Sequence, residues 1–269
     1  MPIGPARMPL MDHLGELRRR LVQIVVALLI ACCILYMFTP YIIDFLVDPI
    51  EDLLDDGYDL VLTKPFEGFT LKFLVALFAS VIVCSPLIFW EILAFFLPAL
   101  KPNERRYVIP TFFVMVILFA CGMVFAYALC MRPMFTFLIG ESNTLGSVFP
   151  VATDYVQFIM IFLIAFGIAF ELPVVIFYLI MFDIVSYSTM RKNWRIVYVV
   201  LFCLAAVVTP DASMVSMLIL AAALIALYEI SLLAARIALN RKIKRQREQE
   251  AAEAAEEGVS SEEDDEENA

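Results

Sequence analysis

Long apolar segments separated by short polar ones dominate the chain between residues 21 and 235. A helix needs about 20 apolar residues to cross a bilayer, because each residue advances it by about 1.5 Å. Six segments approach or exceed this length, so the pattern predicts six membrane-spanning helices. They cover residues 21–38, 69–97, 107–131, 155–182, 196–208 and 214–235. Pro86 interrupts the second of them, and Pro173 lies inside the fourth.

The last two segments are shorter than the others. The fifth has only about 13 apolar residues before Pro210, and the sixth meets Glu229 after a short uninterrupted run. The turn that joins them contains Thr209 and Pro210. We therefore expect a hairpin of two short spans, which must thin the bilayer locally or draw its flanks inward.

The segments between and around the spans complete the expected architecture, an all-α polytopic membrane protein with three regions. Residues 1–20 form a cytoplasmic amphipathic N-terminus, residues 21–235 the six-span domain, and residues 236–269 a basic and then acidic tail that is largely disordered. In the first outer loop, apolar residues recur at helical spacing from Ile42 to Leu54. This spacing predicts a surface amphipathic helix that is broken at Pro49.

Orientation follows from the distribution of lysine and arginine. With a cytoplasmic N-terminus, 16 of the 19 basic residues fall on the inner side, and only Lys64, Lys72 and Arg132 fall on the outer side. This asymmetry is a strong positive-inside signal. Six crossings also return the C-terminal tail to the cytoplasm, so the number of spans and the distribution of basic residues place both ends of the chain on the same side.

Composition narrows the function classes. The chain is 62% hydrophobic, with a mean hydropathy of +0.88, whereas soluble domains are about 45–50% apolar. Its six cysteines are scattered in apolar segments, and His13 is its single histidine. No P-loop, zinc motif or Ser-His pairing is present, so we expect no catalysis, no metal and no cofactor.

Three carboxylates lie in apolar segments: Glu91, Glu171 and Glu229. An ionised carboxylate in hydrocarbon costs several kcal/mol, so such residues usually face protein or water. Glu171 is the deepest, and Pro173 frees a backbone carbonyl one turn earlier. Glu171 is therefore interpreted as a proton-sensing or partner-binding group, or as one end of a hydrogen bond between spans. The latter interpretation is favoured for Glu91 and Glu229.

Two further carboxylates lie among basic residues at the predicted cytoplasmic face. Glu16 precedes Arg18, Arg19 and Arg20, and Glu104 precedes Arg105 and Arg106. Brought together, Glu16 and Glu104 could bind a pair of guanidinium groups. Taken singly, each could instead form a local salt bridge with its own arginines.

In combination, the motifs resemble the TatC family, the multispan core subunit of the twin-arginine (Sec-independent) protein translocase. The resemblance covers nearly all of residues 10–235. It rests on His13-Leu14-x-Glu16-Leu17-Arg18, Pro49, Phe95-Phe96-Leu97-Pro98-Ala99-Leu100, Glu104-Arg105-Arg106, Ala165-Phe166-Gly167-x-x-Phe170-Glu171-Leu172-Pro173 and Thr209-Pro210.

The resemblance implies export of folded proteins whose signal peptides carry two adjacent arginines, driven by the proton gradient. It implies that Glu16 and Glu104 bind those arginines, with Phe95 and Arg105 at the border, and that Leu17 and Arg18 belong to the N-terminal signature. It also implies that Glu171 faces a concave, groove-like interior.

The same resemblance implies partners and a location. Single-span subunits of the TatA and TatB type dock on the chain, which lies as a homo-oligomer in the bacterial or archaeal cytoplasmic membrane and binds no nucleic acid. Thr209 and Ser216 would offer hydrogen bonds to a partner's polar group, although the family pattern has Gln where Ser216 stands. The main alternative is a proton-coupled solute transporter using Glu91, Glu171 and Glu229. A second is a structural scaffold.

Overall fold

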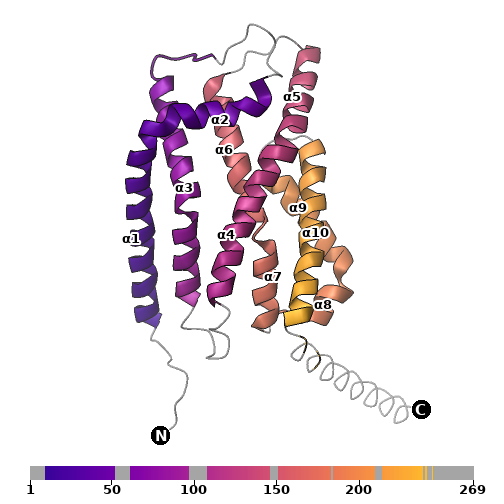
Figure 1. Ribbon diagram of the computed structural model, residues 1–269. Coiled ribbons are helices and arrows are strands. Elements are labelled where there is room, and N and C mark those ends of the chain that lie inside the picture. Colours follow the sequence, from indigo (N-terminus) through magenta and orange to yellow (C-terminus); the bar gives the residue numbers. More distant parts are fainter. Residues whose placement is uncertain are drawn as a thin grey trace, which may run out of the picture. The chain divides into compact units, whose positions relative to one another are not determined.

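Helices make up nearly all of the computed structural model, which describes residues 10–51, 61–96, 108–145, 151–182, 184–209, 214–238, 240 and 244 (Figure 1). Within these residues the only strand-like feature is one isolated bridge between Val61 and Val151. The elements are α1 (Leu10–Leu35), η1 (Tyr36–Phe38), α2 (Thr39–Glu51), α3 (Glu67–Phe96), α4 (Val108–Phe125), the π-helical turn η4 (Ala126–Cys130), α5 (Met131–Leu145), α6 (Ala152–Ala169), α7 (Leu172–Met181), α8 (Tyr187–Lys192), α9 (Trp194–Val208) and α10 (Met214–Ala238).

Five apolar helical stretches are long enough to cross a bilayer, and a sixth is shorter. The long ones are Leu14–Pro49, Glu67–Phe95, Val108–Glu141, Ala152–Met181 and Met217–Ile237, and the short one is Trp194–Val207. They confirm an all-α, multi-pass membrane protein. The predicted N-terminal segment and the first span form one continuous helix, because α1 already begins at Leu10.

The expected hairpin of two short spans is half right. Helix α9 is short, with 15 residues, but α10 has 25 and is long enough to cross by itself. The prediction placed the sixth segment at residues 214–235 but counted it as short, because Glu229 interrupts its apolar run with a charge that would be costly in hydrocarbon. In the structure the Glu229 carboxylate has its own hydrogen-bond donors, described below, so the helix continues past it.

Pro86 does not interrupt its helix, contrary to the sequence prediction. Helix α3 runs from Glu67 to Phe96 with Pro86 inside it, and it packs along α1. Nearby, the Cys84 thiol donates a weak hydrogen bond to the Ala27 carbonyl of α1 at 3.8 Å. Membrane helices tolerate an internal proline where neighbouring helices support the backbone, as α1 does here.

Pro49 does not break its helix either, because a side chain replaces the hydrogen bond that proline removes. Proline lacks the N–H that would bond to the carbonyl four residues earlier, which belongs to Phe45. The Tyr127 hydroxyl of η4 donates to that carbonyl at 2.6 Å. The Tyr127 ring also stacks on Phe45, with centroids 4.8 Å apart and planes 5° apart. This contact fixes α2 against η4.

We predict that Tyr127→Phe lowers the apparent free energy of unfolding by about 1 kcal/mol, because the stack remains but the Phe45 carbonyl loses its donor. Thermal unfolding of the purified protein in detergent measures this. In a Pro49→Ala background, the N–H of residue 49 reaches the same carbonyl, so Tyr127→Phe should cost much less. Equal costs in the two backgrounds would contradict the explanation.

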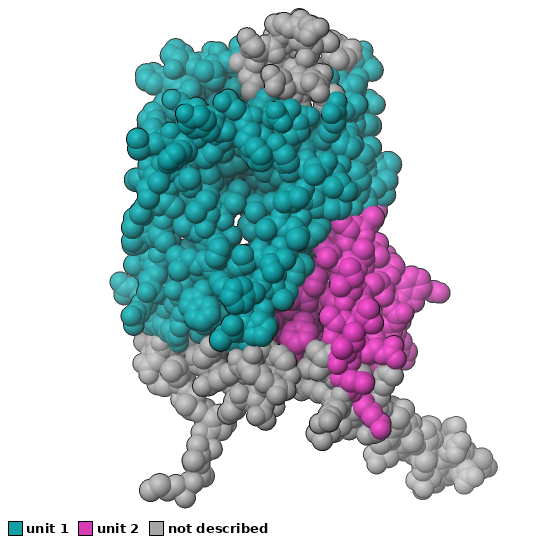
Figure 2. All heavy atoms as spheres, viewed as in Figure 1, with its two compact units in different colours: residues 1–171, 206–220 teal, residues 172–205, 221–269 magenta. Residues whose placement is uncertain are grey.

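The chain divides into two compact units, which Figure 2 colours separately. Unit 1 comprises residues 1–171 and 206–220, and its visible face is hollowed. Its core follows α6, where Phe158, Phe162 and Phe166 lie one turn apart with ring centroids 6.1 and 4.5 Å from their neighbours. All of α4, α3 and α2 pack against α6.

The crossing of α4 and α6 depends on a glycine. A Cβ placed on Gly122 would lie 2.7 Å from the Phe166 carbonyl oxygen and 2.9 Å from Phe170 Cβ. Because a backbone oxygen cannot move aside as a side chain can, only glycine fits this position. The close approach holds the end of α6, where Glu171 follows.

Unit 2 comprises residues 172–205 and 221–269, and its described part contains α7, α8, most of α9 and most of α10. The buried Tyr228 of α10 donates its hydroxyl proton to the Met190 carbonyl of α8 at 2.9 Å. Its ring also meets the Tyr198 ring of α9 edge-on, with centroids 6.1 Å apart. Tyr228 thus joins α8, α9 and α10.

Candidate functional site

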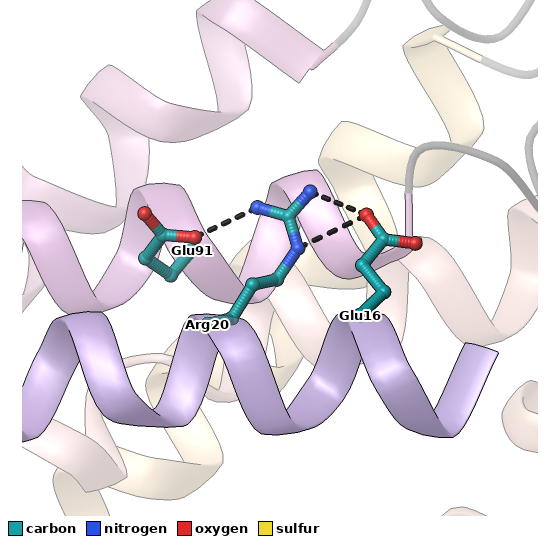
Figure 3. Close-up of polar contacts among 3 residues, drawn as sticks. All are labelled: Glu16, Arg20 and Glu91. Carbon is teal, nitrogen blue, oxygen red and sulfur yellow. Dashed lines mark hydrogen bonds and ion pairs between the residues drawn. The ribbon is translucent and has the colours of Figure 1, made fainter. Parts of the chain in front are cut away.

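An arginine lies between two glutamates where α1 and α3 pack together (Figure 3). The Arg20 guanidinium donates from Nε and Nη2 to the same oxygen of Glu16, at 3.1 and 2.5 Å. Its Nη1 donates to Glu91 Oε2 at 2.7 Å. One planar cation therefore bridges two carboxylates on different helices. We call Glu16, Arg20 and Glu91 the acidic cluster.

The local sequence sets half of the acidic cluster. Glu16 and Arg20 are four residues apart on α1, with the acid nearer the N-terminus, which is the favourable order for an ion pair on a helix. The other half is tertiary, since Glu91 lies 71 residues further along the chain. The Glu91 side chain is 10% exposed, against 24% for Glu16 and 21% for Arg20. Arg20 thus supplies the cation that a buried Glu91 needs.

The other residues predicted for signal binding divide into two groups. Leu17 and Arg18 are exposed on α1, and Phe95 is half-buried near the end of α3. Glu104 and Arg105 lie outside the described residues, so the pairing of Glu16 with Glu104 stays a prediction. The local salt bridge that was the alternative for Glu16 is present, and its partner is Arg20.

Glu171 lies at a break in the fourth apolar stretch. Helix α6 ends at Ala169, and α7 begins at Leu172, just before Pro173. Pro173 cannot donate to the Ala169 carbonyl, and the Glu171 N–H bonds only three residues back, to Ile168. The Glu171 side chain is buried, and neither carboxylate oxygen has a hydrogen-bond partner among the described residues. A buried polar group without a partner costs about 1–3 kcal/mol.

Glu229 has partners instead. Arg191 of α8 donates to Glu229 Oε2 at 2.8 Å, and the Tyr198 hydroxyl of α9 donates to Oε1 at 2.8 Å. The hydrogen bond that Arg191 donates to the Glu229 carboxylate raises the pKa of the Arg191 guanidinium. Glu229 therefore links elements of unit 2, as the interpretation of a bond between spans expects.

The remaining predicted positions are placed as follows. Thr209 is buried and already engaged in an interaction, so it is not a free donor in this conformation. Ser216 lies in the first turn of α10, and its side chain is outside the described set. Pro49 has the structural role given above. Partner docking at Thr209 and Ser216 stays a prediction.

Sequence reasoning named Arg20 only as one of three arginines that could pair locally with Glu16, and it missed that Arg20 also binds Glu91. Two signals pointed to it: the spacing of four from Glu16, and the need of Glu91 for a cation from another helix. All six cysteines are unpaired, and no group of three potential metal ligands occurs within the described residues. What the acidic cluster can do chemically is hold a guanidinium.

Comparison with known proteins gives consistent matches. Residues 12–222 match the family model described as Sec-independent protein translocase protein (TatC). The TatC protein of Carboxydothermus hydrogenoformans is 35% identical over 229 residues, covering 85% of this chain and 93% of that protein. The TatC protein of Aquifex aeolicus is 31% identical over 237 residues, covering 87% and 98%.

A solved structure is also similar. The crystal structure of a twin arginine translocase receptor, TatC, superposes with a TM-score of 0.71 at 29% sequence identity. The match covers 84% of this chain and 99% of the solved one.

Proposed function

Since the chain belongs to the TatC family of Sec-independent protein translocase proteins, we propose that it recognises twin-arginine signal peptides and takes part in exporting folded proteins. Family membership makes it a translocase component rather than an enzyme, and it argues against the solute-transporter alternative. The similar solved protein is described as a twin-arginine receptor. That description supports the proposal for this chain.

The observation that carries the proposal is the acidic cluster. A guanidinium is the group that a twin-arginine signal presents, and Glu16 and Glu91 already hold one, that of Arg20. Leu17 and Arg18 are exposed beside it on α1. A signal's arginines cannot enter hydrocarbon cheaply, so a receptor site at the end of a span, rather than at its middle, suits them.

We assign Glu104 as the second acid of this receptor site, bordered by Arg105 and Phe95. The support is from sequence: Glu104 lies in the segment that follows α3, and Glu91 and Phe95 lie near the end of that helix. The positive-inside distribution supports a cytoplasmic location for both ends of the chain and for this site, in the plasma membrane.

Transport after signal binding involves further subunits in this proposal. We propose that single-span TatA- and TatB-type subunits join the chain, that copies of it associate in the receptor complex, and that the proton motive force drives transport. Membership of the TatC family supports the further subunits. The support for the proton motive force is that the chain has a buried carboxylate, Glu171, in a broken span and no nucleotide-binding motif in its sequence. Docking at Thr209 and Ser216 belongs to this proposal.

Peptide discrimination tests the proposed function. Membranes containing the full-length protein are photo-crosslinked to a twin-arginine signal peptide and to the same peptide with two lysines. We expect crosslinking at least about tenfold stronger with arginine, because an ammonium cannot bridge two carboxylates as a planar guanidinium does. A solute carrier or a scaffold should not discriminate, so equal crosslinking would reject the proposal.

A further inference from the structure

We propose that Arg20 is an internal competitor for the signal peptide, so that an incoming arginine must displace it from the acidic cluster. The inference rests on the proposed function and adds to it a mechanism for selecting paired arginines. It arises from the contacts of a residue that the sequence motifs did not single out.

The geometry shows a guanidinium site that is already filled. All three Arg20 guanidinium nitrogens donate, two to Glu16 Oε1 and one to Glu91 Oε2, and the cation lies between the two carboxylates (Figure 3). Arginine suits this position because its donors form a fixed planar fork. A second guanidinium cannot take the same bridging position while Arg20 holds it.

The occupied site is accessible from one side. The Arg20 side chain is 21% exposed and Glu16 is 24% exposed, so water and a peptide reach this side of the cluster. Glu91 is 10% exposed and forms its inner wall. Two carboxylates around one cation also leave a net charge of about −1, which continues to attract cations.

Replacing the Arg20 guanidinium by a guanidinium of the signal peptide explains why the peptide needs two arginines. When one signal arginine replaces Arg20, the bonds broken and formed are of the same kind, so the net gain in free energy is small. A second arginine binds an acid that Arg20 does not hold, which the proposed function assigns to Glu104. Only the pair therefore gains affinity, and a lone arginine is rejected by the internal one.

The test measures peptide binding to the full-length protein, purified in detergent, by the fluorescence anisotropy of a labelled signal peptide. Arg20→Gln should bind the twin-arginine peptide about tenfold more tightly than the unmodified protein, because the site no longer has to be vacated. The matched control is Arg19→Gln, which removes the same charge from an exposed neighbour outside the cluster. Its affinity should stay within about twofold, since exposed charges contribute little.

A second readout separates competition from a structural role. A peptide with one arginine and one lysine should also bind more tightly to Arg20→Gln, by about the same factor as the twin-arginine peptide, because an arginine of either peptide has to displace Arg20 from the same cluster. Loss of a structural contact would weaken both peptides together. If Arg20→Gln weakens binding, or changes it no more than Arg19→Gln, the competitor model is wrong.

Arg20→Lys covers the case in which Arg20→Gln does not fold. It keeps the charge next to Glu91, but an ammonium bridges the carboxylates less well than a guanidinium. The affinity of Arg20→Lys for the twin-arginine peptide should therefore lie between that of the unmodified protein and that of Arg20→Gln. Affinity equal to or below that of the unmodified protein would overturn the proposal. Failure of the proposed function is a separate result, in which the unmodified protein does not distinguish arginine from lysine peptides.

Discussion

Replacing Glu104 by alanine is expected to abolish crosslinking of a twin-arginine signal peptide, with affinity reduced roughly 100-fold. The physical reason is that removing one partner of a desolvated charge pair costs several kcal/mol, because the other charge is left without compensation. Glu104→Gln should be nearly as defective, since it keeps the shape and loses the charge. Photo-crosslinking in membranes and anisotropy on the purified protein both measure the effect.

Two controls frame this result. Asn103→Ala changes the adjacent, uncharged side chain and should bind normally. Glu16→Ala should weaken binding less than Glu104→Ala, because one carboxylate still holds a signal arginine and because Glu16 is already engaged by Arg20. Unchanged crosslinking in Glu104→Ala would remove this residue from the receptor site.

Replacing Glu171 by leucine is expected to stop export while leaving signal binding intact. Its buried carboxylate has no partner among the described residues, so the free protein carries a cost that a later step must offset. Export of a folded twin-arginine cargo into inverted vesicles should fall at least about tenfold, as for other buried membrane carboxylates that serve transport. Peptide affinity should stay within about twofold, because among the described residues no hydrogen bond joins the Glu171 side chain to the acidic cluster, so the two share no partner.

The stability of the Glu171→Leu variant distinguishes a functional from a structural role of Glu171. Removing an unpaired buried polar group should raise the apparent free energy of unfolding by about 1 kcal/mol, a gain in stability with a loss of activity. Glu141→Leu, at an exposed acid of α5, is the control and should change neither export nor binding. If Glu171→Leu loses initial peptide binding, the separation of roles fails. If it is less stable, Glu171 has a structural role.

The sequence alone determined the class of the protein. Apolar segments of this length leave only bilayer-spanning helices as a stable solution, since hydrocarbon allows no unpaired backbone. The short fifth span was also predicted from the sequence, because Pro210 follows soon after the apolar segment that becomes α9. The motifs around Glu16, Phe95, Glu104 and Glu171 pointed to the family that the comparisons then showed.

Only the tertiary structure showed whether Pro49, Pro86 and Glu229 interrupt their helices. Pro49 and Pro86 read locally as interruptions, yet α2 and α3 continue through both, and Tyr127 from a distant helix supplies the hydrogen bond that Pro49 removes. Glu229 interrupts the apolar run of the sixth span in the sequence, yet in the structure Arg191 and Tyr198 donate to its carboxylate and α10 continues past it.

The acidic cluster shows the same division within one site. The spacing of Glu16 and Arg20 was visible in the sequence, because residues four apart share a helix face. That Arg20 also reaches Glu91 depends on how α1 packs against α3, which no local pattern specifies. Local periodicity fixes which residues are helical and which face they share, whereas a buried charge takes whichever partner the packing of separate helices brings to it.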